Sequence, residues 1–207
     1  ARTEGNVAVM IELNSETDFV AKDASFMAMG QKIADIAATQ KIADVDALKA
    51  ADFGNGESVE LTITNLIAKI GENMSFARGV KIAAPRIGTY LHHNKKVGVV
   101  IGVEGEVSDE TLADLCMHIA FADPMGISPE DVPAELVEKE RQFALEEAMA
   151  SGKPEEIAKK MVEGKIRKFV AERALTEQLF IRDDKKKVKD ILGKAKVTAF
   201  ARYAVGA

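Results

Sequence analysis

The chain has 207 residues, of which 47% are hydrophobic and 29% are charged, and this composition excludes disordered and collagen-like proteins. The net charge of -5 argues against a broad nucleic-acid-binding surface, and a single cysteine, Cys116, excludes an internal disulfide and a cysteine-rich zinc site. The longest apolar run, residues 97–103, is far shorter than the ~20 residues that span a bilayer, so we expect no membrane segment.

The first elements along the chain are a strand and a helix. The odd positions of residues 7–13 are Val, Val, Ile and Leu, which is the alternation of a strand with one apolar face. Ser15 and Asp18 resemble a capping box, so we predict a helix that begins near Thr17. The core-facing stripe of this helix comprises Phe26, Met29, Ile33 and Ile36.

The next region contains further helices and strands. Residues 44–51 favour a short helix, and residues 58–73 fit either a strand or a helix, of which we favour the helix. Residues 76–93 indicate strands interrupted at Pro85, followed by a hairpin turn at residues 93–96.

Residues 97–103 repeat the pattern of the first strand. Their odd positions are Val, Val, Ile and Val, and an acidic turn leads into a helix from about Thr111. Two units of strand, acidic turn and helix, ~90 residues apart, indicate an internal duplication. We therefore predict two similar subdomains, each a small antiparallel sheet covered by helices.

A helical hairpin follows three prolines. Residues 134–150 and 155–175 have narrow apolar stripes on charged helices, which is typical of an antiparallel pair that protrudes from a core. A short helix at residues 188–192 precedes a last strand, residues 197–205, which must return to a sheet. The predicted fold class is α+β, with an inserted antiparallel coiled-coil hairpin. The predicted domains are an N-terminal subdomain (1–85), a C-terminal subdomain (86–133 and 176–207) and the hairpin (134–175).

No arrangement of histidine or cysteine predicts catalysis or a metal site. His92 and His93 are neighbours on a predicted strand and should point to opposite faces. Cys116 and His118 diverge on a predicted helix. The glycines fit no nucleotide-binding motif, and residues 185–187 indicate a solvated lysine loop. We therefore expect a protein that is not an enzyme and has no cofactor and no metal.

Two features are open to both a structural and a binding interpretation. Phe19 lies one heptad before Phe26, but charged residues separate the two, so Phe19 is either the end of the core or an exposed anchor for a partner. Ile70 and Gly71 either end a helix or form an exposed site that a foreign backbone can approach closely.

Three ordered motifs carry a resemblance to a known family. They are NSETDFVAKD at residues 14–23, AKIGEN at residues 68–73, and SGKP at residues 151–154 with MVEG at residues 161–164. Over essentially the whole chain, the sequence resembles the bacterial elongation factor Ts family, the guanine nucleotide exchange factors of elongation factor Tu. This resemblance implies a core of two subdomains with an inserted coiled-coil hairpin.

The resemblance also implies roles for individual residues. The segment that dislodges magnesium from the partner, with Phe19 as the inserted side chain, corresponds to Thr17, Asp18, Phe19 and Val20. Ile70 and Gly71 match residues that approach the partner's phosphate-binding side, and His92 matches a histidine near its nucleotide-binding domain. The family's N-terminal ubiquitin-associated-like domain and its C-terminal module are expected to be absent, and residues 7–13 are expected to have an exposed edge.

The function implied is that of a cytoplasmic translation elongation factor that promotes GDP release from elongation factor Tu, without membrane or direct nucleic-acid contact. The apolar stripes of the hairpin suit either contact with this GTPase or self-association, which leaves a homo-oligomer open. The alternatives are a scaffold or chaperone-like subunit of a translation or RNA-handling complex, and a carboxylate-metal enzyme that uses Asp18 and Asp23.

Overall fold

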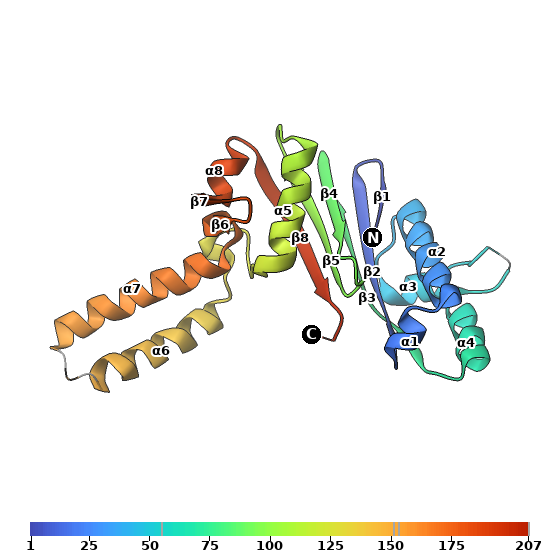
Figure 1. Cartoon of the computed structure of the whole chain (residues 1–207), viewed down its shortest axis with the longest axis horizontal. Coiled ribbons are helices and arrows are strands. Elements are labelled where there is room, and N and C mark those ends of the chain that lie inside the picture. Colours follow the sequence, from blue (N-terminus) through green and yellow to red (C-terminus); the bar gives the residue numbers. More distant parts are fainter. Residues whose placement is uncertain (55, 151, 153, 207) are drawn as a thin grey trace. The chain divides into compact units, whose positions relative to one another are not determined.

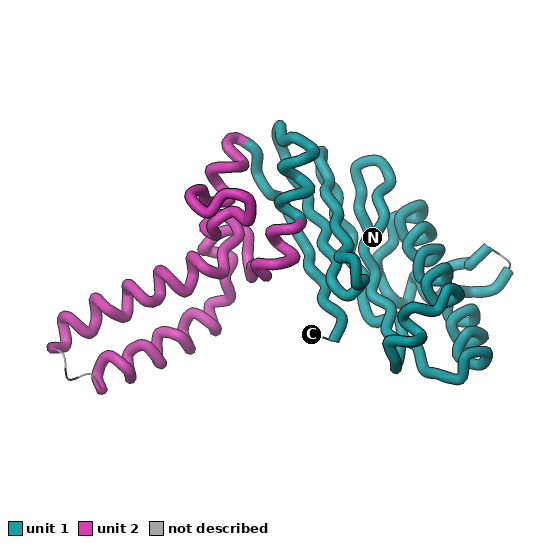
Figure 2. The backbone as a smooth tube through the Cα atoms, in the orientation of Figure 1, with its two compact units in different colours: residues 1–116, 195–207 teal, residues 117–194 magenta. Residues whose placement is uncertain are grey.

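A computed structural model describes residues 1–54, 56–150, 152 and 154–206. The chain forms two compact units, residues 1–116 with 195–207 and residues 117–194, which Figure 2 shows in different colours. Each unit is described by itself below. The predicted division into two subdomains and a hairpin insertion differs in its boundaries from these two compact units, and it stays a prediction.

The elements are labelled in Figure 1. The strands are β1 (Arg2–Glu4), β2 (Val7–Ser15), β3 (Met74–Ala83), β4 (Arg86–Leu91), β5 (Val97–Glu104), β6 (Leu179–Phe180), β7 (Asp183–Lys187) and β8 (Lys196–Ala204). The α-helices are α1 (Asp18–Ala21), α2 (Ala24–Gln40), α3 (Val45–Ala50), α4 (Val59–Ile70), α5 (Asp109–Ala122), α6 (Ala134–Ala150), α7 (Glu155–Arg173) and α8 (Val188–Leu192). Two short 3-10 helices are η1 (Pro129–Asp131) and η2 (Leu175–Glu177).

Two three-stranded antiparallel sheets stack face to face in the first unit. Their strand orders are β1-β2-β3 and β4-β5-β8, and apolar side chains of both sheets meet in one cluster. The cluster includes Ala8, Met10, Val80, Ile82, Ile87, Val100, Ala199 and Ala201. Helices α2, α3 and α4 cover the outer face of the first sheet (Figure 1). The predicted α+β fold class, with small antiparallel sheets covered by helices, is confirmed.

Glycines let the two sheets approach closely. A Cβ atom at Gly98 would lie 2.7 Å from the Met10 sulfur, and one at Gly102 would lie 2.8 Å from the Ala84 Cβ. On its other face, β5 buries Val99, Ile101 and Val103 completely. The prediction of a single apolar face was therefore incomplete, because Gly98, Val100 and Gly102 form a second packed face.

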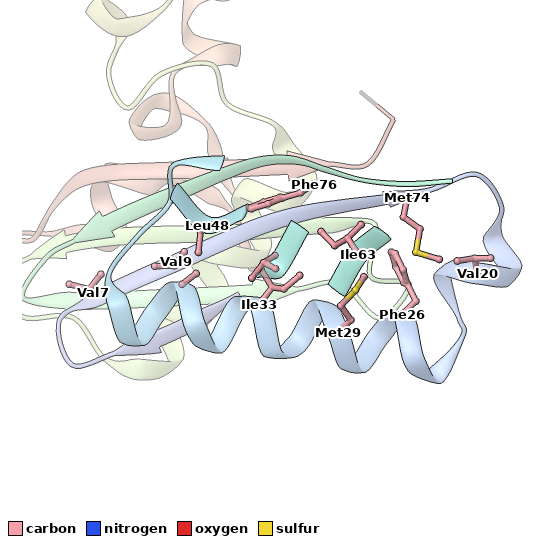
Figure 3. Packing of buried hydrophobic residues seen from close by; sticks show 12 residues of the cluster. Val7, Val9, Val20, Phe26, Met29, Ile33, Leu48, Ile63, Met74 and Phe76 are labelled. Carbon is pink, nitrogen blue, oxygen red and sulfur yellow. The ribbon is translucent and has the colours of Figure 1, made fainter. Parts of the chain in front are cut away.

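A second core lies between the first sheet and its helices. Figure 3 shows that Phe26, Met29 and Ile33 of α2 point toward the sheet. They meet Val7 and Val9 of β2, whose alternation was predicted from the sequence. The helical interpretation of residues 58–73 is also confirmed, since Ser58 caps α4 and Gly71 ends it with a φ of 85°.

Strand β3 contributes to both cores because it contains a β-bulge at Ala77. Glu12 pairs with Arg78 and Leu13 pairs with Phe76, so Ala77 has no counterpart on β2. The side chains before the bulge therefore face the helices and those after it face the second sheet. The two groups are Met74 and Phe76, and Val80 and Ile82.

Two predictions about the N-terminal region were wrong. The edge of β2 is not fully exposed, because β1 pairs with Val7, Ala8 and Val9. The expected single helix from Thr17 is two helices, since α1 ends at Ala21 with Lys22 as its C-cap, and Asp23 caps α2 by accepting hydrogen bonds from the Ser25 and Phe26 amides.

The second unit contains the predicted pair of helices. Small and branched side chains pack α6 against α7, namely Ala144, Ala148, Ala158, Val162 and Ile166. Arg141 pairs with Glu163, and Lys165 pairs with Glu147, across the two helices. Supercoiling as a coiled coil stays a prediction. In the SGKP motif, Ser151 and Lys153 lie outside the described residues, and Pro154 is the N-cap of α7.

The glycine at the sheet interface provides a test of this packing. We expect Gly102→Ala to lower the free energy of unfolding by about 1–3 kcal/mol, because its Cβ would lie within 3 Å of Ala84 and Ile82. The control is Gly164→Ala in α7, where a Cβ meets nothing within 4 Å and stabilises the helix by about 0.5–1 kcal/mol. Denaturant unfolding measures both effects, and equal stability of Gly102→Ala and the wild type would contradict the close packing.

Candidate functional site

The site starts from a single helical turn, α1, between the end of β2 and the start of α2. The Thr17 hydroxyl caps this turn by accepting a hydrogen bond from the Val20 amide at 3.4 Å. The predicted capping box of Ser15 and Asp18 is wrong, since the Ser15 hydroxyl donates to the Thr17 carbonyl at 3.0 Å and Asp18 is the first helical residue.

Phe19 projects from this turn into solvent. Its side chain is 87% exposed, whereas its neighbour Val20 is 4% exposed and belongs to the core under the helices. The interpretation of Phe19 as the end of the core is therefore wrong. An exposed phenylalanine on an anchored turn has the geometry of a binding residue, because aromatic side chains supply much of the energy of protein interfaces.

The end of α4 lies beside α1. The Thr17 hydroxyl donates a hydrogen bond to the Glu72 carboxylate at 2.7 Å, across 55 residues of sequence. Gly71, next to Glu72, is exposed and has a left-handed conformation that favours glycine. Ile70 is partly buried against the core, and Gly71 is the C-cap of α4, so the interpretation as a helix end is confirmed, while binding at these two residues stays a prediction.

A third segment reaches α1 from the turn between β4 and β5. The Lys96 ammonium pairs with the Asp18 carboxylate at 2.9 Å, and this hydrogen bond lowers the pKa of Asp18 below its usual value. A cavity of about 630 Å³ lies between the segment around α1 and this turn, and it is lined by Asp18 and Lys22 on one side and by His93 and Lys95 on the other. The structure thus brings together three segments from the first unit.

His92 lies just after β4, in the same turn. Its Nδ1 atom is 2.7 Å from the Tyr90 hydroxyl, and its ring centroid is 4.1 Å from that of His93. The two histidines therefore do not point to opposite faces of a strand, as the sequence predicted, because β4 ends at Leu91. His92 is half-buried and His93 is exposed.

The titratable groups of the described residues include no cluster of three or more His, Cys, Asp or Glu that could hold a metal ion. Cys116 is buried, and desolvation raises the pKa of its thiol to about 12, so the thiol stays protonated and unreactive at neutral pH. The lysines predicted in a solvated loop lie on β7, where Lys187 pairs with Glu177 at 2.6 Å.

The second unit holds a buried histidine, His118, which the sequence analysis considered only as a possible metal ligand with Cys116. His118 Nε2 lies 2.9 Å from the Gln178 side-chain oxygen. The Gln178 amide nitrogen donates to the Glu172 carbonyl, which makes its oxygen the acceptor and assigns the His118 proton to Nε2. Within the described part of the chain, His118 Nδ1 has no partner. Desolvation lowers the pKa of His118 below 6.5.

Comparison with known proteins identifies the family. The family profile described as Elongation factor TS matches residues 16–207. An elongation factor Ts of Aeromonas salmonicida is 62% identical over the whole chain, which covers 70% of that relative. The chain belongs to the elongation factor Ts family. An elongation factor Ts of Aeromonas hydrophila is 60% identical over the same shares, and one of Idiomarina loihiensis is 47% identical over 99% of the chain and 70% of its own length.

Membership of the elongation factor Ts family gives the chain a role in translation elongation. The predicted resemblance, based on the motifs that contain Phe19, Gly71 and Gly152, is confirmed. The described helices include none that is both long and apolar enough to cross a membrane.

The buried His118 predicts a pH dependence of stability. The pKa of His118 is lower in the folded chain than its ordinary value of 6.5. Between these two pKa values, the unfolded chain binds a proton that the folded chain does not. The free energy of unfolding therefore falls as the pH falls through this range. We expect His118→Gln to lose less stability than the wild type between about pH 7.5 and about pH 5.5. Urea unfolding at both pH values measures this, with His93→Gln as the exposed control, and an equal loss in His118→Gln and the wild type would contradict it.

Proposed function

We propose that the chain is a guanine nucleotide exchange factor that binds elongation factor Tu with bound GDP and promotes GDP release. In this proposal it disturbs the magnesium and phosphate site of the partner, after which GTP binds. It acts in the cytoplasm, where translation takes place, by protein binding alone and without a cofactor.

The observation that carries the proposal is the presentation of Phe19. Its side chain is 87% exposed, on a turn held by the buried Val20, by the Thr17–Glu72 hydrogen bond and by the Asp18–Lys96 ion pair. A turn anchored in this way loses little backbone freedom when its exposed side chain enters a partner. We therefore assign Phe19 as the inserted residue, with Thr17, Asp18 and Val20 holding its position.

Ile70, Gly71 and His92 are proposed as further contacts. Gly71 is exposed and has no side chain, so a backbone of the partner can approach it closely. Ile70 supports the helix end from the core side, and His92 lies in the turn that also carries Lys96. Together with Phe19, these residues present contacts from three segments of the first unit, which suits a protein that distorts a binding site.

Exchange follows from differential binding. If the chain weakens GDP binding to the partner by some factor, GDP weakens the binding of the chain by the same factor. The proposed contacts must therefore be better in the nucleotide-free partner than in the GDP-bound one. In this mechanism no covalent bond is made or broken.

A scaffold role is the second candidate, and a different observation favours it. Three apolar side chains on the helical hairpin are well exposed, with fractions of 64% for Phe143, 69% for Met149 and 49% for Ile157. They suit a partner other than the GTPase, or a second copy of the chain. Binding to elongation factor Tu that GDP does not weaken would favour the scaffold, and sedimentation with and without elongation factor Tu would detect a homo-oligomer.

The central test is Phe19→Ala. We expect the variant to slow the release of a fluorescent GDP from elongation factor Tu by about 30-fold, which corresponds to ~2 kcal/mol for a buried hot spot. Stopped-flow fluorescence measures the rate. The matched control is Phe121→Ala, which removes another exposed phenylalanine, 82% exposed on α5, and should keep the wild-type rate. If Phe19→Ala also keeps the wild-type rate, Phe19 is not the inserted residue.

A further inference from the structure

Helix α1 cannot hold Phe19 in place by itself. It has four residues, and a single helical turn is unstable in water because its nucleation is unfavourable. Val20 is its one buried residue, while Asp18 and Phe19 are exposed. The direction of the Phe19 side chain therefore depends on contacts that α1 makes with other elements.

The contact with Glu72 acts directly on the cap of this turn. A threonine hydroxyl has one proton and two lone pairs. The Thr17 proton is given to the Glu72 carboxylate at 2.7 Å, which turns a lone pair toward the Val20 amide at 3.4 Å. A hydrogen bond to a carboxylate polarises the hydroxyl and strengthens its acceptor side. Glu72 thus stabilises α1 through Thr17.

The position of Glu72 is set by the core. Helix α4 is anchored by the buried Val59 and Ile63 and ends at Gly71, directly before Glu72. After Glu72 the chain enters β3, whose antiparallel register pairs Met74 with Ser15 of β2. Thr17 and Glu72 each lie two residues beyond this pair, so the sheet register itself brings them opposite each other.

The second contact that holds α1, the ion pair between Asp18 and Lys96, contributes less because it lies in solvent. The Asp18 and Lys96 side chains are 69% and 50% exposed. Ion pairs in solvent contribute little because water and salt screen them. Thr17 and Glu72 are both half-buried, so their hydrogen bond is the better candidate for orienting the turn.

We propose that Glu72 is a positioning residue, which holds α1 against the end of α4 so that Phe19 and Gly71 reach the GTPase as one preorganised surface. This inference rests on the proposed function. It adds a residue that does not itself enter the partner, and it couples the two contact segments. Without Glu72, α1 must be ordered at the moment of binding, which weakens the complex in which GDP is released.

The test compares Glu72→Ala with Glu72→Gln in the fluorescent GDP assay. Glu72→Ala removes the acceptor, and we expect it to slow GDP release about tenfold or more at limiting concentrations of the chain. Glu72→Gln keeps an acceptor oxygen and should recover most of the rate. The control is Glu60→Ala, an exposed glutamate on the first turn of α4, which should behave as the wild type.

A double variant separates positioning from direct contact. If Glu72 acts through Phe19, adding Glu72→Ala to Phe19→Ala should slow release little further. If the effects add, Glu72 does not act through Phe19 and the inference is wrong. Hydrogen exchange at the Val20 amide gives a readout without the partner, and it should become faster in Glu72→Ala and not in Glu60→Ala.

The outcomes for the two proposals are distinguishable. A wild-type rate in Glu72→Ala, together with a slow rate in Phe19→Ala, overturns the positioning role and leaves the exchange function standing. Failure of the wild-type chain to accelerate GDP release overturns both. If Glu72→Ala does not fold, Glu72→Met takes its place in both assays, because it keeps the length of the side chain and removes the acceptor of the Thr17 hydrogen bond.

Discussion

The close stacking of two three-stranded sheets is the constraint on which the candidate site depends. Gly98 and Gly102 allow the central strand β5 to lie against the first sheet while its other face is also buried. Interiors packed in this way deform little. The turns that leave the ends of β2, β3 and β5 therefore have fixed starting points, and these turns carry Phe19, Glu72 and Lys96.

Local patterns in the sequence predicted much of this fold. The alternation of residues 7–13 and the Ser58 and Gly71 signals at the ends of α4 were sufficient, because each depends on neighbouring residues alone. Strand β1 was missed, since Arg2, Thr3 and Glu4 have no apolar alternation and pair only because β2 is present. The break before α2 was missed because Lys22 and Asp23 also fit the solvent-facing side of one continuous helix, whereas Asp23 in fact caps the second helix.

The candidate site could be predicted only in part. Phe19 was recognisable as a candidate because charged residues separate it from the core stripe, and its exposure agrees with this. Glu72 and Lys96 could not be found as its supports. Glu72 meets Thr17 through the register of β2 with β3, and Lys96 meets Asp18 through a hairpin turn far along the chain. Such pairs follow from topology, which a single sequence does not reveal.

The bulge at Ala77 places a limit on how this family member can vary. Strand β3 serves the helical core with one half and the sheet interface with the other, and one unpaired residue separates the halves. Deletion of Ala77 would move the side chains of one half of β3 to the opposite face of the sheet, and it would remove either Met74 and Phe76 or Val80 and Ile82 from their core. Substitutions along β3 change single contacts, but the number of residues in this strand must stay constant for both cores to form.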